Sequence, residues 1–349
     1  KKPERIFVIG HKNPDTDSIC SAIAYADIKN RTTQNKKYIP KRAGQINEET
    51  RYVLNRFGVQ PPAYLGNIGT QVKDMDIRTS PQADKSMSLK NTWDLMQENG
   101  IVSLPIRDKD GCLEGLVTIG DIAKTYMDTT DSYLLSNART QYRRIAETVG
   151  GEVVEGNGHG YFVKGRVLVG TANPKMLEGY VEENDMIIMG DREEDHLQAI
   201  SQNVSCIIVG LNIVVSEKVV KLAHEKNIVI IRSPYDTFNI ARLINQSIPV
   251  SFVMKRDNMV TFNTEDFTDD IQDVMIKNRH RAFPVINPHG KCIGTISRRN
   301  FLDMHKKKVV LVDHNEVDQA VDNIEKAEIL EIIDHHKLGT LQTMTPVAF

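Results

Sequence analysis

The chain has 349 residues, of which 40% are hydrophobic and 26% charged, which suits two or three soluble domains. No apolar stretch approaches the length of a membrane span, and the beginning of the sequence lacks a signal-peptide pattern. The net charge of −2 excludes the broad basic excess expected of non-specific nucleic-acid binding. Four scattered cysteines without a CxxC pair argue against structural zinc and disulfides, and they predict a cytoplasmic location.

The charges are distributed unevenly along the chain. Residues 1–70 hold 12 Lys and Arg against 6 Asp and Glu, whereas residues 309–349 hold 2 against 8. The two ends are therefore electrostatically complementary, as two pieces of one domain would be. A basic face beside an acidic metal cluster would suit a small polyanion.

The first strand of the chain leads into a loop with metal-competent side chains. The apolar run 5–9 predicts a buried strand, and Gly10 and the following proline end it. Residues 18–30 have helical composition, so His11, Asp15 and Asp17 lie on the strand-to-helix loop, where α/β sheets bind ligands. Mixed nitrogen and oxygen ligands suit manganese, cobalt, zinc or iron better than calcium. The alternative is that Asp17 or Ser18 merely caps the helix.

A second strand and a second helix follow within residues 1–70. Tyr38 and Ile39 lie in the predicted strand, and the apolar spacing of 46–57 predicts a helix with Asn47 as its cap. The alternation of strands and helices predicts a parallel sheet.

Two distant segments repeat each other at an offset of 179 residues. The matching pairs are Met96 and Met275, Asn99 and Asn278, Pro105 and Pro284, Gly111 and Gly290, Gly115 and Gly294, Thr118 and Ser297, and Asp121 and Asn300. Each copy predicts a helix, a strand, a turn, a second strand, and a further helix beginning at Ile122 or Phe301.

The two copies resemble CBS domains, which are βαββα units that pair into a two-fold module. In that family a Ser or Thr followed three residues later by Asp holds the ribose or phosphate of an adenine nucleotide. The resemblance implies nucleotide contacts from these residues: Ser103, Thr118, Asp121, Ser297 and Asn300. Asn300 stands where the pattern has Asp and carries no charge. Arg279, Arg281 and Arg298 are expected to meet nucleotide phosphates, or alternatively form a solvated charged face.

The segment between the copies, 128–250, predicts its own α/β domain. Core strands are expected at 167–169, 186–189, 206–209 and 228–231, with helices around 193–203 and 216–226. The Gly-rich run 150–165 lacks phosphate-loop spacing and predicts a turn-rich hairpin. The segment resembles a DRTGG domain, with Asp191-Arg192 remaining of that signature, and a structural or dimer-forming role is expected.

The end of the chain returns to metal-competent strand ends. Residues 309–312 predict a buried strand that ends at Asp313-His314-Asn315, and an acidic helical stretch is expected at 316–329. A strand through Ile332 then ends at Asp334-His335-His336. Residues 1–70 and 309–349 are therefore predicted to form one αβ domain, split by the insertion 71–308.

These strand ends together predict a two-metal site. His11, Asp15, Asp17, Asp313 and His335 can hold two divalent ions, with Asp17 as the bridging ligand. Such a pair activates a hydroxide and neutralises phosphoryl oxygens. His336 is expected to contact the substrate phosphate, and Asp334 and His314 to orient the ligands. The alternative for Asp-His-His is a surface turn without metal.

The motifs GHKNPDTDS, VDHNE, DHH and PKRAGQINEET resemble those of family II inorganic pyrophosphatases of the DHH phosphoesterase superfamily. The intervening copies are similar to the nucleotide-regulated subclass, in which CBS units flank a DRTGG domain. The resemblance implies hydrolysis of pyrophosphate to two phosphates by a hydroxide activated between two manganese or cobalt ions, with magnesium arriving with the substrate. It also implies a homodimer that AMP and ADP inhibit and that ATP or diadenosine polyphosphates activate.

The predicted order is a first DHH part (1–70), CBS 1 (71–127), a DRTGG-like domain (128–250), CBS 2 (251–308) and a second DHH part (309–349). The fold class is α/β, with a parallel-sheet DHH domain split by the regulatory insert. Members of the family have a further metal-binding Asp after DHH and a C-terminal substrate domain. This sequence shows neither before Phe349, so full turnover is not expected of it alone.

Two other functions fit the same residues. The first is a DHH phosphoesterase that acts on oligonucleotides or cyclic dinucleotides. The second is a nucleotide-sensing module whose catalytic remnant is inert.

Overall fold

The computed structural model describes residues 3–127, 131–170, 179–302, 304–337, 339 and 347–348. Contacts divide the chain into two compact units. The first comprises Lys1–Ile77, Phe262–His280 and Ile296–Phe349, and the second comprises Arg78–Thr261 and Arg281–Thr295. Both ends of the chain therefore belong to the same unit.

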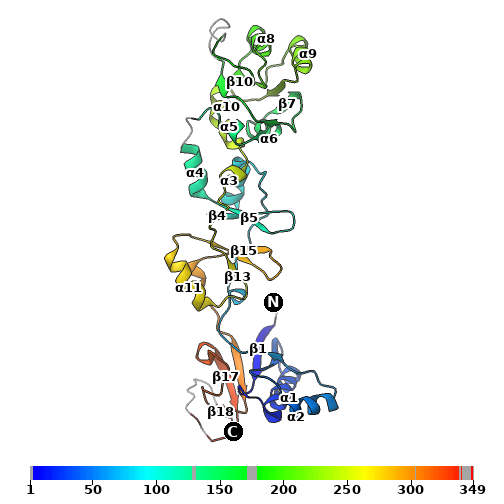
Figure 1. The fold of residues 1–349 in the computed structure, drawn as a ribbon, viewed down its shortest axis with the longest axis vertical. Coiled ribbons are helices and arrows are strands. Elements are labelled where there is room, and N and C mark those ends of the chain that lie inside the picture. Colours follow the sequence, from blue (N-terminus) through cyan, green and yellow to red (C-terminus); the bar gives the residue numbers. More distant parts are fainter. Residues whose placement is uncertain are drawn as a thin grey trace. The chain divides into compact units, whose positions relative to one another are not determined.

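The first unit is built on a six-stranded sheet with the order β18-β17-β16-β1-β2-β3. Its strands are β1 (Glu4–Ile9), β2 (Lys36–Arg42), β3 (Ala63–Tyr64), β16 (Lys308–Val312), β17 (Glu328–Ile333) and β18 (Val347–Ala348). All neighbouring pairs are parallel, and β1 lies directly between β2 and β16. Strands from the two ends of the chain thus share one sheet, as the blue and orange-red strands in Figure 1 show.

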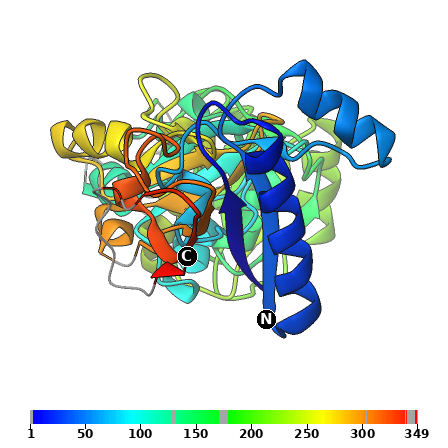
Figure 2. The same ribbon diagram turned by 90° about the horizontal axis from the view of Figure 1, so that it is seen from below.

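Two helices accompany the first strands. Helix α1 (Thr16–Thr32) packs along β1 and β2. Figure 2 shows this helix beside the blue strands. Helix α2 (Glu48–Arg56) begins after Asn47, whose side chain accepts a hydrogen bond from the Thr50 amide, so the predicted cap is confirmed. The cap of α1 is Asp15, not Asp17 or Ser18.

Alternate residues of the central strands pack on opposite faces of the sheet. Ile6, Val8, Val310 and Val312 join one buried cluster, whereas Ile9, Val309 and Leu311 join the other. Both faces of β1 and β16 are therefore covered, as is usual for parallel strands. Neither cluster of buried side chains contains a residue from 71–308.

Replacement of Leu311 by Ala should destabilise this sheet. Leu311 is fully buried on β16, so Leu311→Ala is expected to lower the free energy of unfolding by about 2–5 kcal/mol. The matched control is Leu302→Ala, since Leu302 is 84% exposed. Urea denaturation followed by circular dichroism measures both variants. Equal midpoints for the two variants would contradict this description of the core.

The complementary charges of the two ends meet in ion pairs. Lys12 lies 3.0 Å from Asp322, and Lys29 lies 2.6 Å from Glu331. Each pair joins the first and last segments of the sequence. Because their side chains are partly exposed, each pair stabilises the unit only slightly.

The first unit departs from the predicted helices in two places. Only the 3-10 helix η5 (Ile324–Lys326) forms within 316–329, because Lys12 N bonds to Gln319 O and Ile68 N to Asp322 O. After β15 (Cys292–Ile296) the chain forms the short η4 (Arg298–Phe301), and no helix begins at Phe301 among the described residues up to 307. Lys307 donates to Gly69 O and pairs with Asp74, which leads the chain into β16.

The remaining elements of the first unit come from the segment before the first repeat and from the beginning of the second. They are η1 (Val72–Asp74), β13 (Phe262–Asn263) and α11 (Thr268–Lys277). Hydrogen bonds from Val72 N to Asp266 O and from Thr268 N to Thr70 O tie these segments together.

The second unit contains the first repeat as predicted. Helix α3 (Leu89–Glu98) precedes the antiparallel pair β4 (Ser103–Arg107) and β5 (Leu113–Thr118). Helix α4 (Ile119–Met127) follows and begins three residues before the predicted start at Ile122. Strands β14 (Phe283–Ile286) and β15 (Cys292–Ile296), from the second repeat, are neighbours in another sheet.

The middle of the chain forms a five-stranded sheet with the order β7-β12-β11-β10-β9. Its strands are β7 (Glu152–Glu155), β9 (Val167–Val169), β10 (Met186–Met189), β11 (Cys206–Val209) and β12 (Val229–Arg232). Strands β9 to β12 are parallel. The other elements are α5 (Leu134–Asn137), β6 (Thr140–Gln141), α6 (Tyr142–Thr148), β8 (Tyr161–Phe162), α8 (Glu193–Ser201), α9 (Glu217–Glu225), α10 (Thr237–Leu243), η2 (Ile244–Ser247) and η3 (Val250–Phe252).

The hairpin predicted for 150–165 is wrong. Strand β7 pairs with β12 and β8 pairs with β6, so the two strands of the Gly-rich run join different sheets. Gly151 lies so close to the backbone of Arg232 that a Cβ there would be 2.1 Å from the carbonyl oxygen. This close approach, rather than a phosphate, accounts for that glycine.

Among the described residues, the structure has no helix with both the length and the apolar character needed to cross a membrane. The four cysteines are free thiols.

Candidate metal centre

The loops that follow β1, β16 and β17 come together because parallel strands end at the same edge of a sheet. The first loop turns tightly at Gly10. His11 N donates to Ser18 Oγ at 3.1 Å, and a Cβ on Gly10 would lie only 1.9 Å from that oxygen. Glycine at this position therefore permits the close packing of the loop against α1.

Asp15 has two neighbours in this loop. Its Oδ1 accepts a hydrogen bond from Ser18 N at 2.9 Å, which caps α1. The same oxygen lies 3.8 Å from Nε2 of His11. The capping bond thus fixes Asp15 beside His11, and the carboxylate keeps further lone pairs for a cation.

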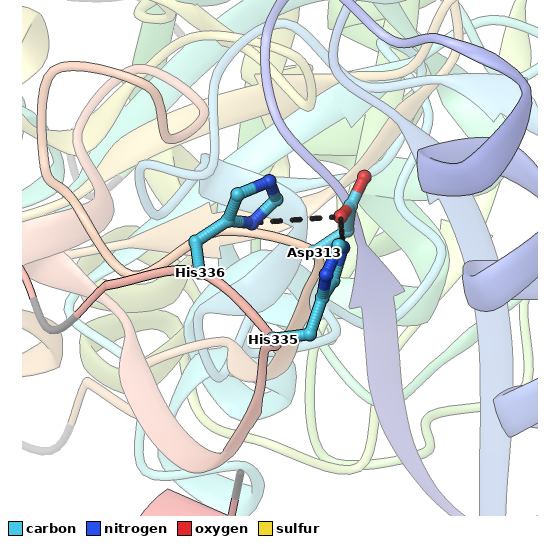
Figure 3. A group of neighbouring side chains, drawn as sticks. All are labelled: Asp313, His335 and His336. Carbon is cyan, nitrogen blue, oxygen red and sulfur yellow. Dashed lines mark hydrogen bonds and ion pairs between the residues drawn. The ribbon is translucent and has the colours of Figure 1, made fainter.

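Asp313 lies at the middle of the cluster. Its Oδ2 is 3.4 Å from Nε2 of His11, and its Oδ1 is 3.2 Å from Nε2 of His335 and 3.7 Å from Nδ1 of His336. Figure 3 shows both histidines, from the loop after β17, directed toward the Asp313 carboxylate. The Asp313 backbone has φ +59°, in the left-handed region that Asp tolerates better than most residues. This turn directs the side chain at the end of β16.

Asp17 reaches the cluster from the first turn of α1. Its Oδ2 lies 3.4 Å from Nε2 of His335, and its Oδ1 accepts a hydrogen bond from Ser21 Oγ. The structure therefore brings together His11, Asp15, Asp17, Asp313, His335 and His336, which the sequence predicted for the metal and substrate sites.

The ligand atoms have a spacing that suits divalent ions. Nitrogen and oxygen ligands bind such ions at about 2.0–2.2 Å, so two donors on one ion lie roughly 3 Å apart. Asp313 forms one group with His11 and Asp15 and another with His335 and His336. In this arrangement Asp313, rather than Asp17, is the residue common to both groups.

The electrostatics of the cluster favour a cation. Burial of Asp313, together with the nearby Asp17 and Asp15 carboxylates, raises the pKa of Asp313 above its ordinary value. A divalent ion between these groups would offset their repulsion and hold the carboxylate ionised. Burial also lowers the pKa of His314, whose Nδ1 contacts Val312 O at 2.9 Å. Its buried Nε2 has no hydrogen-bond partner among the described residues.

A cavity of about 630 Å³ opens beside the cluster. His11, Asp313 and His336 line it, together with residues that the sequence analysis did not assign to the site: Lys12, Asn13, Asn315, Glu316, Asp318, Gln319 and Lys337. Asn315 follows Asp313 by two residues at the same strand end. This position in the sequence could have indicated that Asn315 lies near the metal centre.

The first predicted nucleotide half-site forms a compact hydrogen-bonded group in the second unit. Thr118 donates through its N and Oγ1 to Asp121 Oδ2, at 2.9 and 2.7 Å. Ser103 pairs with Thr118 across β4 and β5. Lys255 lies 3.5 Å from the other oxygen of Asp121.

The second half-site has the same local geometry in the first unit. Ser297 donates through its N and Oγ to Asn300 Oδ1, at 2.7 and 3.0 Å. The Asn300 amide also donates to Asp76 O at 2.6 Å, a bond that an aspartate could not make. This bond gives a structural reason for asparagine at position 300.

The three predicted arginines differ in their surroundings. Arg298 donates to the backbone oxygens of Met275, Asn278 and His280 at the end of α11, so its guanidinium is engaged there. Arg279 and Arg281 are exposed. Arg279 belongs to the first unit and Arg281 to the second.

Comparison with known proteins assigns the middle of the chain to two domain families. The CBS domain model matches residues 72–128 and 250–307, and the DRTGG domain model matches residues 144–247. A solved structure of the CBS and DRTGG domains from the regulatory region of a Clostridium perfringens pyrophosphatase, complexed with the activator diadenosine tetraphosphate, is 32% identical. It aligns with a TM-score of 0.62 over 66% of this chain and 100% of that chain.

Two curated relatives match nearly the whole sequence. A cobalt-dependent inorganic pyrophosphatase of Clostridium perfringens is 38% identical over 99% of this chain and 62% of its own length. A probable manganese-dependent inorganic pyrophosphatase of Thermotoga maritima is 36% identical over 100% of this chain and 63% of its own length. The chain thus spans less than two thirds of these relatives. With its two CBS domains and its DRTGG domain, the chain belongs to the family of proteins with a CBS–DRTGG regulatory region like that of the Clostridium perfringens pyrophosphatase.

Proposed function

We propose that this protein hydrolyses inorganic pyrophosphate to two phosphates with manganese or cobalt, under control of adenine nucleotides. One observation carries the proposal: strand ends from both termini bring Asp313 within 3.4 Å of both His11 and His335. The named dependence of the relatives on cobalt and manganese supports the choice of metal. The two ends would form one DHH domain that the regulatory region interrupts.

His11, Asp15, Asp17, Asp313 and His335 are the residues that would hold the two ions. When bound, the ions supply charge neutralisation at phosphoryl oxygens and acidify a water molecule. His336 is the substrate-contacting residue, because Asp334 engages its Nδ1 and leaves Nε2, which donates to a phosphate oxygen when the imidazole is protonated. Lys12 and Lys337 line the same cavity, and together with the bound ions they would offset its carboxylates and favour a polyanion there. Magnesium would accompany the pyrophosphate.

Nucleotides would bind at the CBS domains through Ser103, Thr118, Asp121, Ser297 and Asn300, with phosphates near Arg279, Arg281 and Arg298. The diadenosine tetraphosphate complex of the Clostridium perfringens regulatory region supports an adenine ligand. AMP and ADP would inhibit, and ATP or a diadenosine polyphosphate would activate, by binding two conformations with different affinities. We further propose a homodimer in the cytoplasm, with neither nucleic acid nor membrane as a partner.

Phosphate release from pyrophosphate and from a cyclic dinucleotide tests the choice of substrate. With manganese present, we expect pyrophosphate to be hydrolysed at least about 100-fold faster. The comparison uses the same full-length preparation for both substrates. Preferential hydrolysis of the dinucleotide would favour another DHH phosphoesterase and overturn the proposal.

Loss of the Asp121 carboxylate should weaken AMP binding. Asp121 accepts two hydrogen bonds from Thr118 and would be the charged partner of the ribose hydroxyls. Asp121→Ala is expected to raise the Kd for AMP about 10- to 100-fold, as loss of a charged hydrogen bond does. Isothermal titration calorimetry measures the change. The control is Asp94→Asn, since Asp94 has a partly exposed side chain and, among the described residues, forms an ion pair with Lys90 of the same helix α3. An unchanged Kd in Asp121→Ala would remove Asp121 from the nucleotide site.

A further inference from the structure

Two buried polar side chains lie behind His336 and link the two strand-end loops. Asn315 and Asp334 are 5% and 4% exposed. Asn315 Nδ2 donates to Asp334 Oδ2 and also to Lys337 O at 3.1 Å. Asn315 Oδ1 accepts a hydrogen bond from Gly339 N. One amide therefore connects the loop after β16 with the chain that follows β17.

Asp334, which is held by Asn315, is in turn hydrogen-bonded to His336. Its Oδ1 accepts hydrogen bonds from His336 Nδ1 at 2.7 Å and from His336 N at 3.2 Å. Because a carboxylate oxygen only accepts, Nδ1 of His336 carries the hydrogen. The amide of Asn315 in turn has its NH₂ toward Asp334, since its oxygen faces Gly339 N. Every donor in the chain Asn315–Asp334–His336 thus faces an acceptor.

We propose that Asn315 is a positioning residue that holds Asp334, and through it fixes the orientation and tautomer of His336 in the metal centre. Asn315 lies at the cavity wall, but its side-chain amide is engaged by Asp334, Lys337 and Gly339, so it acts through these contacts rather than on substrate. Its contribution is directional, because only an amide with NH₂ on one side and oxygen on the other satisfies these three partners. The inference rests on the proposed function for its catalytic consequence, but not for the tautomer.

The direction of these hydrogen bonds can be tested by exchanging the amide at position 315 and the carboxylate at position 334. In Asp334→Asn alone, the new side chain has one NH₂ group, and this group must point either toward the NH₂ of Asn315 or toward the hydrogen on His336 Nδ1. In both orientations two donors face each other, so one contact is repulsive. In the double variant, Asn315→Asp with Asp334→Asn, the new amide at position 334 donates to the new carboxylate at position 315 and accepts from His336. The chain of donors and acceptors toward His336 is then restored, although the bond to Lys337 O is lost.

The tautomer and the kinetics are measured on the same proteins. Nitrogen chemical shifts of His336 in the full-length protein with magnesium report the tautomer directly. We expect hydrogen on Nδ1 in the wild type and the double variant, and a changed population in Asp334→Asn. With manganese and pyrophosphate, Asp334→Asn should lose about 10- to 100-fold in kcat. The double variant should recover at least about fivefold of that loss, with KM changing less than kcat.

The Asn315→Leu variant separates positioning from general stability. It removes all three contacts of the Asn315 amide, and we expect kcat to fall while calorimetry shows Mn²⁺ affinity within about threefold of wild type. Additive losses in the double variant, or an unchanged tautomer in Asp334→Asn, would overturn the inference. A wild-type protein without pyrophosphatase activity would refute the proposed function instead, and the tautomer measurement would still decide the role of Asn315.

Discussion

The Asp313→Asn variant is expected to lose both manganese binding and hydrolysis. Asp313 is the buried carboxylate shared by the two groups of ligand atoms, so its charge would act on both ions. Asparagine tolerates the left-handed backbone found at this position and retains the side-chain shape, so the change is mainly one of charge. Mn²⁺ affinity should fall at least about 100-fold, and kcat for pyrophosphate by about 1,000-fold or more.

Calorimetric titration with MnCl₂ and a phosphate-release assay measure these two losses. The matched control is Asp27→Asn, which makes the same change from aspartate to asparagine on helix α1. Asp27 is exposed, and in the part of the chain that the structure describes its ion pair is with Arg31, so both measurements should match the wild type. Equal Mn²⁺ affinity in Asp313→Asn and Asp27→Asn would contradict the assignment of Asp313 as a metal ligand.

Excision of residues 71–308 from the full-length protein is expected to leave hydrolysis and abolish the response to AMP. The geometry of the first unit permits the deletion. Lys307 donates to Gly69 O at 2.9 Å, so the two ends of the excised segment lie side by side and a short linker can join them. Of the pairing between β1 and β16, the excision removes Lys308, the partner of Ile6, and leaves the pairs from Phe7–Val309 to Ile9–Leu311.

The packing supports the same expectation. Both buried clusters of this sheet consist of residues outside 71–308, including Ile9, Val310 and Leu311. The metal-competent residues lie outside the insertion as well. We expect the rate without nucleotide to stay within about fivefold of wild type, because the excision leaves these side chains unchanged.

The response to AMP is measured as the ratio of rates with and without the nucleotide. This ratio should become 1 after excision, because no CBS domain remains. Circular dichroism checks that the shortened protein is folded. A surviving AMP response would place the regulatory nucleotide outside the CBS domains. It would contradict the proposal that the insertion 71–308 regulates the domain formed by the two ends of the chain.

Local signals in the sequence predicted much of the fold. Asn47 predicted the start of a helix, and the apolar runs of β1 and β16 predicted buried strands. These predictions depend on neighbouring residues in the sequence and on few distant contacts. Strand-end chemistry likewise predicted the cluster around Asp313, because two parallel strands that end in ligand residues place them at one edge. The opposite charges of the two ends indicated that they meet, as the Lys29–Glu331 pair now illustrates.

The features that sequence reasoning missed depend on distant contacts. The acidic stretch 316–329 has helical spacing, but its carbonyls at Gln319 and Asp322 accept hydrogen bonds from Lys12 and Ile68 instead. The hydrogen bonds of the Arg298 guanidinium to carbonyls at the end of α11 likewise join residues about 20 positions apart, which the spacing of the repeat does not indicate. The role of Asn315 depends on the direction of its amide, which composition and spacing do not encode.

The central claim is that the two ends of the chain form one metal-dependent site for pyrophosphate. Its most direct test is phosphate release from pyrophosphate by the full-length protein, first stripped of metal by a chelator and then titrated with MnCl₂. We predict no turnover after stripping and restored turnover with manganese in the wild type, but not in Asp313→Asn at the same concentrations. Hydrolysis that persists without metal, or full restoration in Asp313→Asn, would contradict the account.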